Sequence, residues 1–115
     1  MSAIPLGGES FVTAAVDHGR FTLSGDSKAC NRAYNKIVRA AHRLKESAGG
    51  EKAVLVDLLA YPDDSVKSWA AAYLLPICPE AAAKTLEDIA SGSGLIAFSA
   101  AMTLKEWHAG RLKLP

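Results

Sequence analysis

The chain has 115 residues and a mass of 12.1 kDa, which suits a single compact domain over residues 1–115. Half of the residues are hydrophobic and 22% are charged, which is a globular rather than a disordered composition. A net charge of +1 argues against a dedicated nucleic-acid domain, because such domains draw most of their affinity from a strongly basic surface. The start, Met1 to Pro5, lacks the basic and then apolar run of a signal peptide, and the longest apolar run, 69–79, is too short for the ~20 residues of a bilayer span. We therefore expect a cytoplasmic protein with no membrane span.

The beginning of the chain predicts helical structure preceded by a loose arm. Alanine is abundant, β-branched residues are few and the glycines lie between periodic segments, a pattern typical of all-α proteins with short connections. Residues 1–8 read as the arm. A short helix is predicted from Glu9 to about His18, closed by Gly19, and residues 20–25 are predicted as a connector.

The clearest element is a long amphipathic helix over residues 26–47. Ser24 or Asp26 can cap its first turn, and Gly49-Gly50 stops it. On a helical wheel the apolar residues gather on one side, and five cations fall within an arc of about 80° on the other. The apolar set is Ala33, Tyr34, Ile37, Ala40, Ala41 and Leu44, and the basic set is Lys28, Arg32, Lys36, Arg39 and Arg43. No acidic residue interrupts positions 27–45, so all charges on the solvent-exposed side of this helix are positive.

Four shorter helices are predicted after this one, over residues 51–61, 65–75, 79–91 and 95–108, and they form an internal repeat. A shift of 30 residues overlays the pairs Val56/Leu86, Leu59/Ile89, Val66/Ile96, Ala70/Ala100, Ala71/Ala101 and Leu74/Leu104. Residues 51–75 and 79–108 are therefore two helical pairs, and stacked pairs bury a core that one pair alone could not. The predicted fold is a short HEAT-like α-solenoid of about six helices, in which the long basic helix caps the N-terminal end.

Several short motifs resemble one known family. They are Ala33-Tyr34-Asn35-Lys36, Leu58-Leu59 before Pro62-Asp63-Asp64, Trp69-Ala70-Ala71 with Leu74-Leu75-Pro76, Pro79-Glu80, Leu86-Glu87 with Ile89, and Ala101-Met102-Thr103-Leu104 with Trp107. In this order they resemble the bacterial family named domain of unknown function 2019, over roughly residues 30–108. The resemblance implies an α/α superhelix of HEAT-like type. It brings no catalytic residue, and the first 25 residues do not contribute to it.

The common signatures of enzyme and metal sites are missing from the sequence. It contains no G-x-S-x-G, H-E-x-x-H, C-x-x-C, Walker loop or G-x-G-x-x-G motif. Cys30 and Cys78 match no metal-ligand spacing, and both are expected to be buried and inert. We therefore expect no enzymatic activity, no cofactor and no metal. An enzyme with a nonlocal site built from His42, Glu46 or His108 stays open as an alternative.

The basic set and two aromatic residues are the candidates for a contact surface. The five cations form either a solvated or internally paired face, or a surface that binds an acidic partner. Residues 1–48 carry a net charge of +3 and residues 49–115 carry −2, so the molecule is mildly polarised. Trp69 and Trp107 are either core residues or anchors for a partner. The predicted partner-binding residues are Lys28, Arg32, Lys36, Arg39, Arg43, Trp69 and Tyr73.

These observations favour a non-catalytic protein-binding module. Small single-domain HEAT-like bacterial proteins are candidates for immunity proteins, which neutralise a toxin by covering its active site, and charge complementarity would raise the association rate. The alternative is a helical-repeat protein that binds nucleic acid through the basic set. The near-neutral total charge and the acidic C-terminal half make nucleic acid the less favoured partner.

Overall fold

The described part of the chain, residues 8–46 and 50–115 of a computed structural model, is all-helical. This confirms the predicted fold class. Its six helices are α1 (Glu9–Ser24), α2 (Ser27–Glu46), α3 (Gly50–Leu58), α4 (Asp64–Leu74), α5 (Pro79–Ala90) and α6 (Leu95–His108). The predicted arm over residues 1–8 lies outside the described residues except for Gly8, which precedes α1.

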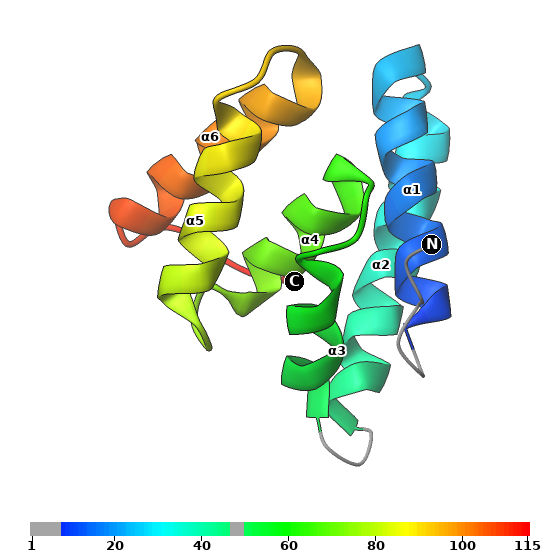
Figure 1. Cartoon of the computed structure of the whole chain (residues 1–115). Coiled ribbons are helices and arrows are strands. Elements are labelled where there is room, and N and C mark those ends of the chain that lie inside the picture. Colours follow the sequence, from blue (N-terminus) through cyan, green and yellow to red (C-terminus); the bar gives the residue numbers. More distant parts are fainter. Residues whose placement is uncertain (1–7, 47–49) are drawn as a thin grey trace.

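Each helix packs against the next along the chain, and α4 also contacts α1 and α6. Figure 1 shows α1 and α2 side by side at one side of the molecule, α5 and α6 at the other, and α4 between the two pairs. This succession of packed neighbours is what a HEAT-like stack requires, although the solenoid description itself stays a prediction. None of the described helices is long and apolar enough to cross a membrane.

Local capping chemistry explains why most helix starts agree with the sequence prediction to within one residue. The backbone N–H of Ala29 donates to Asp26 Oδ1 at 3.0 Å, so Asp26 rather than Ser24 caps α2. Asp63 caps α4 in the same way, because its Oδ1 accepts from the N–H of Val66 at 3.0 Å. Pro79 opens α5, where its missing N–H would have no helical partner anyway. The predicted end of α2 at residue 47 falls outside the described residues.

The prediction for the first helix was wrong, because α1 does not end near His18 but continues to Ser24. Gly19 is a buried position inside the helix. A Cβ atom there would lie 2.6 Å from Ser65 Oγ and 2.7 Å from Ser65 Cβ. The residue that ends α1 is Gly25, whose φ of 77° is a left-handed conformation that glycine adopts without steric cost. The expected connector over residues 20–25 is therefore mostly helix.

The third helix is shorter than predicted, since α3 ends at Leu58 rather than at residue 61. The next three backbone N–H groups, those of residues 59–61, bond to carbonyls three residues earlier, which is a tighter turn than the α-helix. Pro62 explains the ending, because the residue before a proline is disfavoured in the α conformation. The chain then reaches Asp63 in an extended conformation, ready to cap α4.

The pattern of buried residues agrees with part of the predicted internal repeat and differs from the rest. In α4 and α6, Ala70 and Ala100 are both buried, as are Leu74 and Leu104, in agreement with a shift of 30 residues, whereas Ala71 is buried and its predicted counterpart Ala101 is exposed. In α3 and α5 the shift is 31, because Leu55 and Leu58 are buried where α5 buries Leu86 and Ile89. Val56, the predicted counterpart of Leu86, is 39% exposed. The stretch from Leu58 to Ala70 is one residue longer than the stretch from Ile89 to Ala100, which accounts for the change of register.

Candidate functional site

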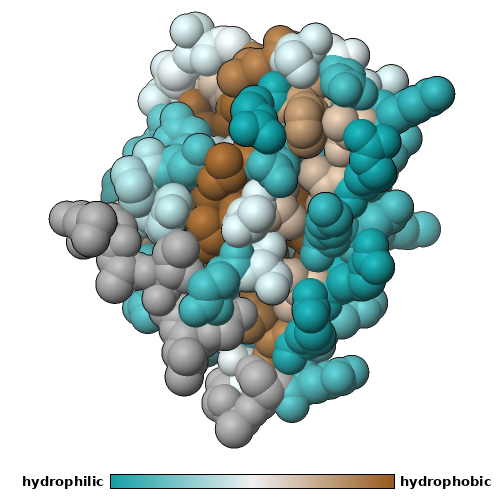
Figure 2. Space-filling view, turned by 90° about the vertical axis from the view of Figure 1, so that its right-hand side faces the viewer, coloured by the Kyte–Doolittle hydropathy of each residue, from teal (hydrophilic) through white to brown (hydrophobic). Residues whose placement is uncertain are grey.

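The five cations predicted on the wet side of the long helix all lie exposed on α2, and we call them the basic face: Lys28, Arg32, Lys36, Arg39 and Arg43. The opposite side of α2 buries Ala29, Ala33, Ile37, Ala40, Ala41 and Leu44. In Figure 1 α2 lies behind α1, so the 90° turn brings it to the right in Figure 2, where a column of hydrophilic side chains follows the edge of the molecule. Burial of one helix side thus fixes the direction in which all five cations point.

The basic face is not neutralised by carboxylates of the described residues. The ion pairs found there join Arg20 to Asp17, Lys67 to Asp64, and Arg111 to Glu106, and none includes a residue of α2. Within α2, the Arg39 Nε–H donates to the carbonyl of Asn35 at 3.4 Å, which leaves the charge of the guanidinium unpaired. The five cations therefore form no ion pairs with the acidic C-terminal half within residues 8–46 and 50–115, which excludes an internally paired face there.

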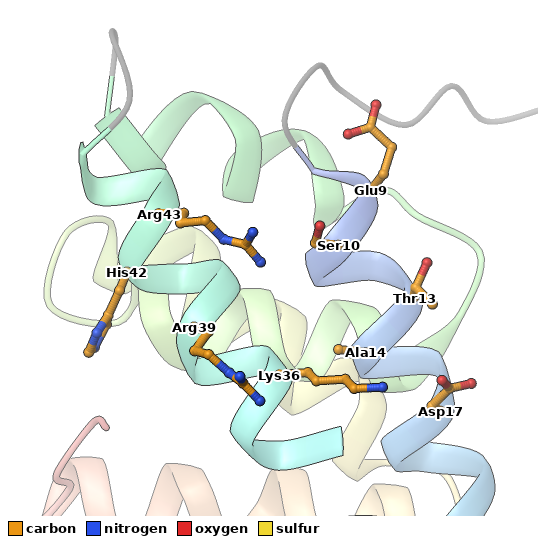
Figure 3. Close-up of a pocket in the computed structure, with 9 residues that line it drawn as sticks. All are labelled: Glu9, Ser10, Thr13, Ala14, Asp17, Lys36, Arg39, His42 and Arg43. Carbon is orange, nitrogen blue, oxygen red and sulfur yellow. The ribbon is translucent and has the colours of Figure 1, made fainter. Parts of the chain in front are cut away.

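A surface groove of about 740 Å³ runs beside the basic face, between α1 and α2. In Figure 3 the side chains of Lys36 and Arg43 extend from α2 in the direction of α1, where Ser10 and Asp17 lie on the opposite wall. Small side chains, Ser10, Thr13 and Ala14, form the middle of that wall, and Glu9 and Asp17 stand at its two ends. The groove thus has cations along its α2 wall, and its α1 wall has small residues in the middle and one carboxylate at each end.

His42 also borders the groove, but its side chain contacts the C-terminal residue of the chain. Its imidazole points away from the groove in Figure 3. Its Nε2 lies 3.3 Å from the main-chain oxygen of Pro115, and since an oxygen of this kind only accepts, Nε2–H is the donor. Glu46 and His108 are exposed, and no group of three or more His, Cys, Asp or Glu side chains among the described residues is placed to hold a metal ion.

The aromatic candidates lie in a cluster rather than on the basic face. Trp69 is half-buried. The centre of its ring lies 5.2 Å from the ring centre of His18, 5.9 Å from that of Tyr34 and 6.5 Å from that of Tyr73. Tyr34 was expected on the buried side of α2 but is 37% exposed, because its ring reaches Trp69 at the rim of that side. Tyr73 is only 4% exposed, so its side chain lies beneath the surface and not on a contact face.

The Tyr73 hydroxyl is buried with no hydrogen-bond partner among the described residues. Burial is the main reason why the pKa of Tyr73 rises to about 12, and nearby Tyr34 adds to the effect. A buried hydroxyl without a partner loses its hydration without compensation, so we expect Tyr73→Phe to raise the free energy of unfolding by about 1 kcal/mol. Urea denaturation checks this, with Tyr34→Phe at the exposed ring as the control that should change little. A loss of stability in Tyr73→Phe would mean that the hydroxyl is hydrogen-bonded in solution.

Neither cysteine is fully buried, contrary to the expectation from the sequence. Cys30 Sγ lies 3.5 Å from the hydroxyl oxygen of Thr22, which in turn lies 3.5 Å from Nδ1 of His18. This cluster joins α1 to the start of α2. It was missed because α1 was expected to stop before Thr22. The spacing of Phe11, Ala15, His18 and Thr22, by four, three and four residues, is the helical signal that could have revealed it.

Burial lowers the pKa of His18 below its ordinary value of 6.5. The unfolded chain then takes up a proton at a higher pH than the folded protein does. Stability from the neutral imidazole is therefore present above about pH 6.5 and is lost as the pH falls through the folded-state pKa. We expect the free energy of unfolding to fall less between pH 7.5 and pH 5 in His18→Gln than in the wild type, measured by urea denaturation. The same substitution at the exposed His108 is the control, and it should keep the wild-type pH dependence.

The comparisons with known proteins agree with the helical architecture. The family described as domain of unknown function (DUF2019) matches residues 9–107 of the chain. The chain belongs to this family. The match starts at the first residue of α1, so the DUF2019 domain includes the N-terminal helix, which the sequence motifs alone did not indicate.

A solved structure shows a similar fold over nearly the whole DUF2019 domain. The crystal structure of the protein RPA1889 from Rhodopseudomonas palustris CGA009 matches with a TM-score of 0.84 and 25% sequence identity, covering 98% of this chain and 94% of that one. A search of the curated proteins gives no match. The comparisons therefore support the family and the fold, and function has to be argued from the surface.

Proposed function

We propose that this DUF2019 protein is a non-catalytic binding protein whose basic face docks onto an acidic surface of a partner protein. The observation that carries the proposal is the set of five exposed cations on one helix, none paired with a carboxylate of the described residues. Like charges on one helix side repel by a few tenths of a kcal/mol per pair, and no ion pair of the described residues includes one of the five cations. An acidic partner would remove the repulsion and supply the missing counter-charges.

The packing of α2 onto the core favours a protein partner. The side of α2 opposite to the basic face is part of the core that α1, α3 and α4 also form. A preformed helix surface loses little conformational entropy on association, and one-signed charge steers an oppositely charged partner into place. The narrower form of the proposal is an immunity role, in which the partner is a toxin and binding covers its active site. That form rests on analogy with other small helical proteins of this type.

The test is a pull-down from the native host with the tagged chain, eluted in rising salt and analysed by mass spectrometry. Wild type and the charge-reversal variant Arg32→Glu/Arg39→Glu are compared. We expect one stoichiometric protein with the wild type and a loss of its affinity by roughly tenfold or more in the variant. The melting temperature should stay the same, because both side chains are exposed.

The matched control reverses two exposed lysines elsewhere, Lys52→Glu/Lys84→Glu, which changes the net charge by the same amount on α3 and α5. Retention of the partner by the control but not by the first variant assigns binding to α2. Equal weakening in both would contradict a localised basic face, as would full binding by Arg32→Glu/Arg39→Glu. Nucleic acid released at moderate salt, in place of a protein, would favour the alternative function, and a toxin domain among the proteins would support the immunity role.

A further inference from the structure

A second hollow, of about 160 Å³, lies on the other side of α1, where α1, α4 and α6 meet. No charged side chain lines it. Its polar lining consists of one imidazole, His18, one indole, Trp69, and five hydroxyls: Thr22, Ser65, Ser68, Ser99 and Thr103. The three helices thus place seven polar side chains around a space of the order of five water molecules, taking about 30 Å³ for each.

Ser65 is the most buried of these side chains. It is only 7% exposed. The hydroxyls of Thr22 and Thr103 each donate to a backbone carbonyl four residues earlier in their own helix. Among the described residues the Tyr73 hydroxyl, and not that of Ser65, is buried without a partner, so the Ser65 hydroxyl is accessible from the hollow and free to donate and accept. Ser65 therefore offers a free hydroxyl to a molecule that enters the hollow.

The hydrogen bonds of Thr22 determine which nitrogen of His18 can accept. The Thr22 hydroxyl has one hydrogen, and its shortest contact, 2.8 Å to the carbonyl of His18, uses it. At 3.5 Å from His18 Nδ1 the Thr22 oxygen can then only accept, so this contact favours the tautomer with the hydrogen on Nδ1. This leaves Nε2 with a free lone pair and without a partner among the described residues. Burial, which lowers the pKa of His18, keeps the ring neutral at pH 7.

Trp69 supplies the complementary group. Its indole N–H is a donor that makes no hydrogen bond with the described residues, and its ring stands almost perpendicular to that of His18, at 82°. The residues that line the hollow thus include an acceptor, His18, and a donor, Trp69, together with serine hydroxyls that can do both. An ionised ligand would lose its hydration without meeting a counter-charge, which is costly, whereas an uncharged one would not.

We propose that this hollow is a binding site for a small uncharged polyol. Each hydroxyl of a polyol donates and accepts at one atom, which suits the mixture of His18, Trp69 and serine groups. The volume limits the ligand to about three or four carbon atoms, since it replaces only a few waters. The site is separate from the basic face, because it involves α1, α4 and α6 and no residue of α2.

The experiment is an NMR titration of the ¹⁵N-labelled full chain with glycerol and erythritol, observing both indole N–H resonances. Trp69 lines the hollow and Trp107 does not, so Trp107 is the internal reference. We expect the Trp69 resonance to shift and saturate with a dissociation constant in the millimolar range, while that of Trp107 stays in place. Glycerate, which has the size of glycerol but carries a carboxylate, should leave Trp69 unchanged.

A filling variant tests the location. Ser99 is an exposed residue at the rim of the hollow, and Ser99→Leu should weaken binding at least tenfold without affecting the fold. The same substitution at exposed Ser93, which lies outside the hollow, is the control and should titrate like the wild type. The proposal is wrong if both indole resonances drift together without saturating, if glycerate binds as well as glycerol, or if Ser99→Leu binds like the wild type.

Discussion

We expect Phe11→Ala to lower the free energy of unfolding by roughly 3–5 kcal/mol, which is the range for removing a buried aromatic side chain. Phe11 is the third residue of α1 and has no exposed surface. Its ring contacts that of Tyr73 in α4 edge-on, with 6.2 Å between the ring centres. The substitution therefore removes both the hydrophobic burial and the contact that fixes α1 on α4. Native domains have only ~5–15 kcal/mol of stability, so the loss would be a large part of the total.

The matched control is Phe98→Ala, the same chemical change in α6 at a side chain that is 65% exposed. It should cost no more than about 0.5 kcal/mol, as surface substitutions usually do. Both variants are measured by urea denaturation, followed by circular dichroism. A small effect of Phe11→Ala would contradict the role of α1 as an integral part of the core. An equally large effect of Phe98→Ala would mean that the α6 surface is covered in solution.

Signals that act within one helix turn were read correctly from the sequence. Asp63 and Pro79 mark the starts of α4 and α5 because a carboxylate cap and a missing N–H have their effect on the nearest backbone groups. The basic face followed in the same way, since the 3.6-residue period fixes which residues of α2 share a side. Such effects need no knowledge of the partners in space, which is why five exposed cations could be named in advance.

Signals that depend on a distant neighbour were read wrongly. Gly19 has the sequence appearance of a helix end, yet it lies inside α1, because Ser65 of α4 leaves no room for a side chain. Tyr73 looked like a surface anchor and is buried, since α1 covers that side of α4 with Phe11. The polar hollow was not predicted at all. Its residues come from three helices whose mutual positions no local pattern defines.

Gly19 gives the sharpest test of how α1 and α4 cross. In an isolated helix, Gly→Ala stabilises by about 1 kcal/mol. Here the added Cβ would lie 2.7 Å from Ser65 Cβ, an atom bonded directly to the backbone of α4, so the two helices would have to move apart. Overpacking of this kind costs roughly 1–3 kcal/mol and exceeds the gain in helix propensity. We therefore expect Gly19→Ala to reduce the free energy of unfolding by roughly 1 kcal/mol, with the sign opposite to that of an isolated helix.

The second substitution in the cycle is Ser65→Gly, which removes both Ser65 atoms that the new methyl group would meet. The double variant Gly19→Ala/Ser65→Gly should be more stable than the sum of the single effects indicates. The new Cβ of residue 19 in α1 then takes the place of the Cβ that residue 65 in α4 has lost. Ser68→Gly is the control, because it makes the same change in the same helix, but the added methyl group does not meet Ser68. Urea denaturation of the single and double variants gives the coupling free energies. Additivity in both pairs would show that α1 and α4 do not make their closest approach at Gly19, whereas coupling with Ser65 alone would place the crossing there.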